Sequence, residues 1–356
     1  MTKFGRVEIE EEVFRLGRDG RELRPFKLSA EVEARGYSRP LQRVMVDFGA
    51  EESFGKAVQR IKEHYEIDLS GSAVRRVTLE HAAALKQQQE EEREGELKPG
   101  FGAEVVIGEL DGCLVPIVES HPAPQPKPPQ PKPPPPRELK WEEARLALAR
   151  EPAFLRPHYG ATMGSVDEAG EVLADCVRRA GATAQTHLHC LGDGAAWIPQ
   201  QVQNRFGDQA TYLLDFYHVS EYLAAAARKI APANSKPWLA QQKEQLLNNR
   251  VAEVCAALRP YQEPLTVADE EAPVRVCLRY LNNHRDFLNY QAALQADLPI
   301  GSGEVESGHR SVIQQRLKLT GAWWLRENAE KMIALRVARA NDDWQPYWLN
   351  LRQAVG

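Results

Sequence analysis

The stretch AQTHLHCLGDGAAWIPQQVQNRFGDQATYLLDFYHVSEYLAAAARKI, residues 184–230, runs twice through the same order of segments. Each half begins with a short apolar run, continues with an aspartate and ends with a segment of helical periodicity. The two aspartates are Asp193, which lies between two glycines, and Asp215. Because strands that alternate with helices form sheets covered by helices, this stretch predicts a mixed α/β fold.

The segments before this stretch extend the same sheet. Residues 103–120, AEVVIGELDGCLVPIVES, are β-branched and apolar at both odd and even positions, which is typical of a central strand, and they include Asp111. Two further segments fit the pattern: HYGATMGS (158–165) predicts a short strand, and SVDEAGEVLADCVRRAG (165–181) predicts an amphipathic helix that ends at Gly181. LKWEEARLALAR (139–150) fits either a helix or a strand, and residues 219–300 are predicted to be mostly helical.

The N-terminal part of the chain has a different pattern. Residues 5–30 alternate loosely around a GRDGRE turn, as expected of a small β-hairpin. Residues 53–96 predict two helices joined by a short polar turn, with Arg75 and Arg76 early in the second helix. This arrangement fits a DNA-binding helix-turn-helix, in which the second helix carries the contacts, and it fits an ordinary helical hairpin equally well.

Composition limits the class of protein. The 356 residues are 43% hydrophobic, with scattered cysteines and no Cys-x-x-Cys pair, so we expect a core of ordinary size and free thiols. The sequence shows neither an apolar run of about 20 residues nor a signal-like start, so we expect no membrane partner and a cytoplasmic, nucleoid-associated location. The net charge of -5 gives no global support for nucleic acid binding, but residues 301–340 hold seven Arg or Lys against four Glu, a local charge of +3.

Three acids occupy positions that suit metal chemistry. Asp111 lies within the predicted central strand, Asp193 lies at a strand end, and a glutamate opens a late helix in PIGSGEVESGHR (299–310). A carboxylate in a buried strand is unfavourable unless a cation pairs with it. Oxygen-only ligands suit Mg²⁺ or Mn²⁺, and such ions can promote phosphoryl transfer.

Helical periodicity selects one glutamate of the late helix. Glu304 and Glu306 point about 160° apart on a regular α-helix, so both cannot face the sheet. Glu306 falls inside the apolar stripe formed by Val305, Val312, Ile313 and Leu317, and Glu304 falls outside it. The sequence therefore predicts Glu306 as the third ligand. Asp215 competes with Asp193 for the second place, but the glycines around Asp193 leave more room for a metal and a phosphate.

Five phrases together resemble the Kra-type insertion-sequence transposases, a bacterial branch of the DDE superfamily. They are LDGCLVPI, YGATMGSVDEAGEVL, LGDGAAWI, LDFYHVSEYL and IGSGEVESGHRSVIQQRLKLTGAWW, in order between about Glu104 and Ala340. The resemblance implies an RNase H-like catalytic domain with a mixed sheet flanked by helices and an all-α insertion. It implies Mg²⁺-dependent (or Mn²⁺-dependent) cleavage and strand transfer of DNA at transposon ends.

The resemblance also assigns individual residues. The catalytic, metal-binding acids of the family fall on Asp111, Asp193 and Glu306, and the Asp-x-x-His element falls on Asp215 and His218 as outer supports. Arg310 falls where such proteins commonly carry a basic residue. Together with local charge and aromatic character, the predicted DNA contacts are Arg75, Arg76, Arg310, Arg316, Lys318 and Trp323.

The predicted organisation follows from the resemblance and the segment pattern. It consists of an N-terminal hairpin and helix-turn-helix-like region (1–98), the first part of the catalytic domain (99–218) with a Pro-rich loop (121–136), the helical insertion (219–300), the C-terminal part of the catalytic domain (301–340) and a tail (341–356).

The expected partners are the terminal inverted repeats and the target DNA, with the chain acting as a dimer or a larger assembly. One departure matters: many relatives carry paired cysteines in the N-terminal hairpin, and this chain has none before Cys113. A DNA-binding regulator descended from a transposase is therefore an alternative, and an RNase H-like nuclease is a second. His187 and His189 are interpreted as packing or surface residues, and Trp323 and Trp324 fit either the core or a displaced base.

Overall fold

The computed structural model describes the chain in two compact units. The described residues are all except 9, 17–20, 30–31, 34–35, 94–96, 121–136 and 354–356. The first unit comprises residues 1–93, 114–144 and 309–356, and the second comprises 94–113 and 145–308. The predicted Pro-rich loop lies outside the described residues.

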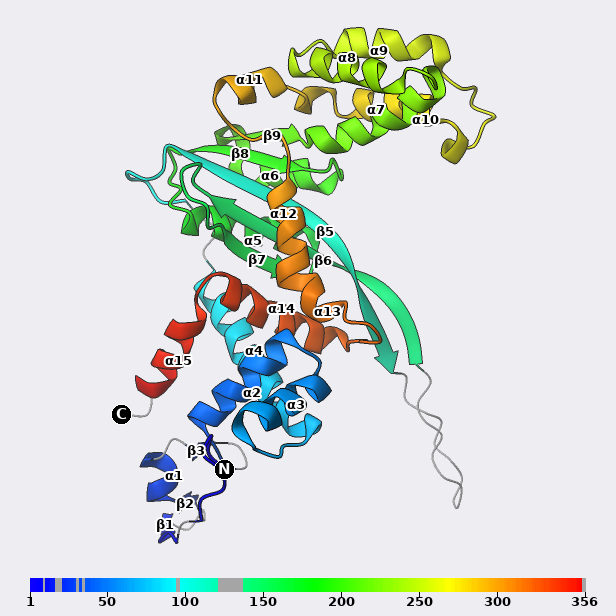
Figure 1. Cartoon of the computed structure of the whole chain (residues 1–356). Coiled ribbons are helices and arrows are strands. Elements are labelled where there is room, and N and C mark those ends of the chain that lie inside the picture. The colour runs from blue at the N-terminus through cyan, green and yellow to red at the C-terminus, as the bar shows by residue number, and fades with distance from the viewer. Residues whose placement is uncertain are drawn as a thin grey trace. The chain divides into compact units, whose positions relative to one another are not determined.

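A mixed five-stranded sheet forms the framework of the second unit. The strand order is β7-β6-β5-β8-β9, with β5 (Val105–Ser120) in the centre (Figure 1). β8 (His187–Gly192) runs parallel to both β5 and β9 (Ala210–Leu214), whereas β6 (Arg137–Arg150) and β7 (His158–Thr162) are antiparallel. The predicted mixed α/β fold is therefore confirmed, and the ambiguous segment 139–150 is a strand.

Helices cover both faces of this sheet. On one face, Val106 and Leu188 pack against α5 (Val166–Arg179) and α6 (Trp197–Phe206). On the other face, Ile107, Leu191 and Leu213 pack against apolar side chains of α7 (Phe216–Ile230), α9 (Val251–Leu258) and α10 (Pro273–Asn283). Neighbouring strand residues point to opposite faces, so a core on both sides accounts for the apolar run without alternation.

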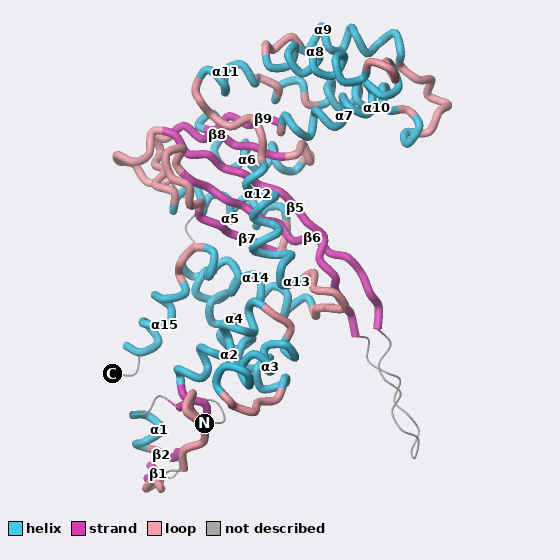
Figure 2. The backbone as a smooth tube through the Cα atoms, viewed as in Figure 1, coloured by secondary structure: helices cyan, strands magenta, loops and turns pink. Residues whose placement is uncertain are grey.

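Local sequence signals explain where these elements begin and end. Ser165 and Glu168 form a capping box at the start of α5, and Gly181 takes a left-handed φ of 87° just after its end. The predicted helical stretch 219–300 is confirmed as α7 to α11 with short 3₁₀ turns (Figure 2). The remaining elements of the second unit are η1 (Gly207–Gln209), α8 (Ser235–Leu247), η2 (Arg259–Tyr261), η3 (Asp269–Glu271), η4 (Arg285–Phe287), α11 (Tyr290–Gln295) and α12 (Gly303–Gly308).

The first unit is built mainly from helices. The predicted hairpin is present as β1 (Phe14–Leu16) paired antiparallel with β2 (Arg21–Leu23). The two predicted helices are α3 (Phe54–Tyr65) and α4 (Gly71–Glu92), preceded by α2 (Arg39–Glu51). The other elements are α1 (Pro25–Ser29), β3 (Val32–Glu33), β4 (Tyr37–Ser38), the π-helical η5 (His309–Gln314), α13 (Gln315–Leu317), α14 (Arg326–Ala340) and α15 (Trp344–Gln353).

The residues expected as a C-terminal tail form α15, which joins the core of the first unit. His81 on α4 lies in this contact: its Nδ1 accepts from the Tyr347 hydroxyl at 2.7 Å, and its Nε2 donates to Gln42 Oε1 at 2.9 Å. Trp348 packs against the same ring. The neutral imidazole satisfies both bonds, and burial together with Arg39 lowers the pKa of His81 to about 4.

Two further findings concern the cysteines and the helices. All five cysteines are free thiols. Within the described part of the chain, no helix combines the length and the apolar character needed to cross a bilayer.

We predict that acid weakens the first unit through His81. The pKa is lower in the folded state than in the unfolded chain, so the stabilisation is complete above about pH 6.5 and is lost as the pH falls toward 4, by up to about 3 kcal/mol. Urea unfolding at pH 7.5 and pH 5 should show a smaller difference in His81→Gln than in the wild type. The matched control is exposed His64→Gln, which should keep the wild-type difference; equal pH dependence in all three proteins would contradict the assignment.

Candidate active site

Three aspartates lie level with one another across three parallel strands: Asp111 lies within β5, just beyond the part that pairs with β8, and Asp193 and Asp215 directly follow the ends of β8 and β9. In the register of β5 and β8, Glu109 is opposite Leu191, so two residues further along these strands Asp111 is level with Asp193. In the register of β8 and β9, Gly192 is opposite Leu214, so Asp193 is level with Asp215. Neighbouring strands are about 4.8 Å apart, and the carboxyl ends of parallel strands are the usual place for a ligand in an α/β sheet.

The aspartates differ in how far they are buried. Asp111 and Asp193 are half-buried, and each uses one oxygen for a local backbone donor: Asp111 accepts from Gly112 at 2.7 Å and Asp193 from Ala195 at 2.9 Å. Asp215 is only 2% exposed. Asp111 and Asp193 are therefore the two of the three that solvent, and hence a metal or a phosphate, can reach.

The turn that carries Asp193 is held by the helical insertion. Tyr280 on α10 donates from its hydroxyl to the Asp193 carbonyl at 2.6 Å, and His284 Nε2 donates to the Gly194 carbonyl at 2.9 Å. Gly194 has a left-handed φ of 90°, and an added Cβ would lie 2.6 Å from Leu214 Cδ1. Only glycine fits this turn, and burial raises the pKa of Tyr280 so that the phenol stays a donor.

We predict that Tyr280→Phe loosens this turn. A lost hydrogen bond of about 1 kcal/mol should increase local opening about fivefold, so amide hydrogen exchange at residues 193–195 should accelerate by that factor. Tyr261→Phe is the matched control, since Tyr261 is exposed on the same unit. Unchanged exchange at the turn in Tyr280→Phe would show that the hydroxyl does not hold it.

Asp215 has a structural use for both of its oxygens. Oδ1 caps α7 by accepting from the backbone N–H groups of Tyr217 at 2.6 Å and His218 at 3.1 Å. Oδ2 accepts from the backbone N–H of Ser302 at 2.7 Å and from its hydroxyl at 2.6 Å. The predicted link between Asp215 and His218 is thus made to the backbone, and the His218 ring instead lies 6.3 Å from the Tyr222 ring.

The segment before and within α12 is fastened to the sheet by one side chain from each parallel strand or its end. His189 of β8 donates from Nε2 to the Pro299 carbonyl at 2.8 Å, Asp215 holds Ser302, and Glu109 Oε2 of β5 accepts from the Val305 N–H at 2.7 Å. These bonds place α12 on the face of the sheet that carries the row of aspartates. His189 therefore has a packing role, as predicted.

Glu109 is a site residue that the sequence analysis did not identify. It is 1% exposed, and burial raises its pKa to about 8, so the carboxyl is protonated at neutral pH. Its Oε2 accepts a hydrogen bond from the Val305 N–H, one of the N–H groups in the first turn of α12 that have no partner within the helix. The available signal was its spacing: Glu109 is two residues before Asp111 and so shares its face of the strand.

We predict that Glu109→Ala destabilises the second unit by about 1–3 kcal/mol, because the Val305 N–H stays buried without an acceptor. Glu109→Gln is the matched control, since it keeps an uncharged acceptor at the same place. Urea unfolding at neutral pH distinguishes them. Equal stability of the two variants would contradict the role assigned to the acceptor.

The sequence analysis predicted that Glu306 lies on the buried face of its helix and Glu304 outside it, and this prediction is wrong. Glu306 is exposed, whereas Glu304 is half-buried and accepts from Arg150 Nε at 2.8 and 3.0 Å. The prediction assumed one continuous α-helix, but α12 ends at Gly308 and the next turn, η5, is π-helical. A π-turn contains more residues than an α-turn, so the apolar positions of η5 do not report the phase of α12. The role of Glu306 as a metal ligand stays a prediction.

The half-buried aspartates fit a divalent cation in their chemistry. Mg²⁺ keeps several waters and often uses only one or two carboxylates together with substrate phosphates, a demand that Asp111 and Asp193 can meet. Within the described residues, no three His, Cys, Asp or Glu side chains are gathered closely enough to hold a metal. The predicted third ligand, Glu306, is thus not brought together with the pair.

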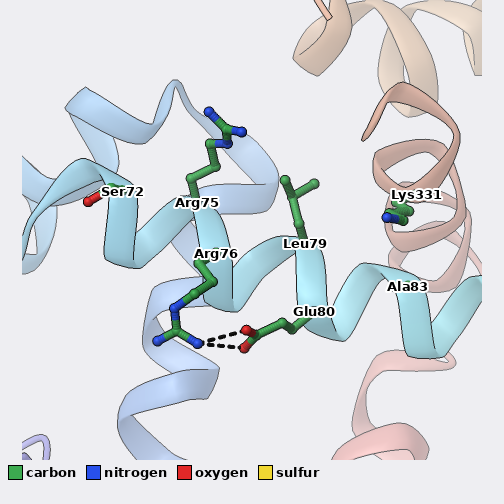
Figure 3. A pocket seen from close by; sticks show the side chains of 7 residues that line it. All are labelled: Ser72, Arg75, Arg76, Leu79, Glu80, Ala83 and Lys331. Carbon is green, nitrogen blue, oxygen red and sulfur yellow. Dashed lines mark hydrogen bonds and ion pairs between the residues drawn. The ribbon is translucent and has the colours of Figure 1, made fainter. Parts of the chain in front are cut away.

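The predicted DNA-binding arginines of the first unit lie on α4. They line a hollow of about 510 Å³ together with Ser72, Leu79, Glu80, Ala83 and Lys331 (Figure 3). Arg76 donates to both oxygens of Glu80 at 2.7 and 2.9 Å, whereas Arg75 is exposed and projects from the other side of the helix (Figure 3). Arg75 is therefore the better placed of the two for a phosphate.

The remaining predicted DNA contacts fall into two groups. Arg310 and Lys318 are exposed and open to a phosphate. Arg316 is only 2% exposed, so it offers little surface to a phosphate, and its role as a DNA contact stays a prediction. Its guanidinium lies over the rings of Phe54 and Trp324. Trp323 lines the same pocket as Arg316 and is 39% exposed.

No protein-family model matches the chain, and no curated protein matches it at a significant level.

Proposed function

We propose that the chain is a metal-dependent DDE transposase that cuts and joins DNA at the ends of an insertion sequence. The observation that carries the proposal is the alignment of Asp111, within β5, with Asp193, directly after the carboxyl end of the adjacent parallel strand β8. The ordered motif phrases support it, as does the architecture: a mixed sheet flanked by helices with an all-α insertion is what an RNase H-like catalytic domain requires.

In this proposal, the residues of the candidate site have separate roles. Asp111 and Asp193 hold Mg²⁺ or Mn²⁺, and the ion supplies charge stabilisation for a phosphodiester under attack. Glu306 completes the acidic set once DNA is bound. Tyr280 and His284 fix the backbone of the Asp193 turn, while Glu109 and Asp215 fix the segment that carries Glu306.

We predict that Asp111→Asn and Asp193→Asn abolish metal-dependent cleavage while leaving DNA binding largely intact. The probes are labelled duplexes copied from the DNA on each side of the chain's own gene, incubated with and without Mg²⁺ or Mn²⁺. Exposed Asp208→Asn is the matched control, because it removes one acid from the same unit. Cleavage at wild-type rates by Asp111→Asn in a clean preparation would end the proposal.

The two glutamates of α12 should separate activity from stability. Glu306→Gln should abolish cleavage without changing the free energy of unfolding, because the side chain is exposed. Glu304→Gln should keep cleavage but lower stability by about 1 kcal/mol, because it weakens the bond to half-buried Arg150. Loss of cleavage in Glu304→Gln alone would exchange the two roles.

A second candidate is a DNA-binding regulator descended from such an enzyme. The exposure of Glu306, away from the aspartate pair, is the observation that favours it. A regulator would bind the same flanking duplexes and leave them uncut with either metal.

A further inference from the structure

A cavity of about 710 Å³ in the first unit has aromatic walls and basic groups. Phe54, Trp323 and Trp324 supply the rings, and Arg75 and Arg316 supply the charges. Among the described residues that line it there is no Asp or Glu. The volume lies in the range of small-molecule sites, about 300–1,000 Å³.

Arg316 is a buried cation that lines this cavity and has one unused donor. Its guanidinium lies over the rings of Phe54 and Trp324, 4.8 and 4.7 Å from their centroids, and its Nε donates to the Gly49 carbonyl at 2.9 Å. Its Nη2 is buried and has no hydrogen-bond partner in the described part of the chain. Burial and the nearby Arg336 lower the pKa of Arg316 to about 10. A buried N–H of this kind calls for an acceptor.

Two more side chains present a flat surface and a charge at the same cavity. Trp323 is 39% exposed, and its ring meets the exposed Trp141 edge-on at 6.2 Å. Arg75 is exposed and lies one helical turn before Leu79, on the same side of α4 (Figure 3). Both Arg75 and Leu79 line the cavity.

These groups together define the chemistry of the occupant. An exposed tryptophan favours a planar ring that stacks, the unused Nη2 donor favours an acceptor on or near that ring, and exposed Arg75 favours an anion. Inorganic phosphate would leave the aromatic wall unused, and a run of acidic residues such as polyglutamate has no planar ring. A nucleotide supplies all three features, and its base must be unpaired, because a paired base is stacked within a duplex.

We propose that this cavity binds one unpaired nucleotide of a DNA strand, with the base on Trp323, a base acceptor at Arg316 Nη2 and a phosphate at Arg75. The inference rests on the proposed action on DNA for the identity of the strand. Its test uses binding alone, without a divalent metal, so its outcome is independent of cleavage.

The experiment measures anisotropy of fluorescein-labelled oligothymidylate with the full chain in EDTA. An abasic oligonucleotide of the same length separates base stacking from phosphate charge, and polyglutamate tests for an acidic peptide. The variants are Trp323→Ala, Trp323→Phe, Arg316→Lys and Arg75→Ala. Arg60→Ala is the control for Arg75, since the Arg60 side chain on α3 is 42% exposed and lines neither this cavity nor the hollow of Figure 3.

The expected result is a selective loss of binding. Trp323→Ala should weaken oligothymidylate binding about 5- to 100-fold and leave abasic binding unchanged, while Trp323→Phe stays within about threefold of the wild type. Arg75→Ala should weaken both oligonucleotides and flatten their salt dependence, and Arg60→Ala should change neither. Arg316→Lys should weaken only the oligonucleotide with bases; should that variant fail to fold, Trp323→Ala decides.

Three results would overturn the proposal. In the first, the wild type binds the intact and abasic strands with equal affinity. In the second, the ratio of these two affinities is unchanged in Trp323→Ala. In the third, polyglutamate binds as tightly as oligothymidylate and its binding is equally sensitive to Trp323→Ala. The last result would assign the cavity to an acidic peptide.

Discussion

The second unit depends on three buried side chains that hold one stretch of backbone. His189, Asp215 and Glu109 come from β8, the end of β9 and β5, and they bind Pro299, Ser302 and Val305, respectively. Each of these polar groups is almost completely buried, so each depends on the others being in place. The geometry of the candidate site follows, because the stretch leads into α12 and the strands carry the row of aspartates.

Burial separates the acids that build this site from those that can act in it. Asp215 and Glu109 are enclosed, and their oxygens serve backbone donors. Asp111 and Asp193 are half-buried at neighbouring positions on β5 and just after β8, where a substrate can approach. Carboxylates of one row thus have different uses, set by access to solvent more than by position along the strand.

The sequence predicted the features that depend on neighbours in the chain. The strand, acid and helix order around Asp193 and Asp215 was predicted because periodicity, glycines and caps act over a few residues. Glu109 was not identified, because its partner Val305 is 196 residues away and nothing local to either residue reports the bond. The predicted orientation of Glu306 was wrong because a π-helical turn follows α12. The burial of Arg316 was not predicted because its partners, Phe54 and Gly49, lie on helices distant in the sequence.

The helical insertion separates two residues that this site joins. Asp215 and Ser302 are joined by two hydrogen bonds across 87 residues of chain, and α8 to α11 lie in that interval. Closing so long a loop without structure inside it is entropically unfavourable, and contacts of this range slow folding. Once the insertion has folded, its helices shorten the distance that the chain must search. The carboxylate cap of α7 depends only on residues next to it in the chain, whereas the bond to Ser302 joins residues on either side of the insertion. The anchoring of α12 therefore carries the entropic cost of closing that loop.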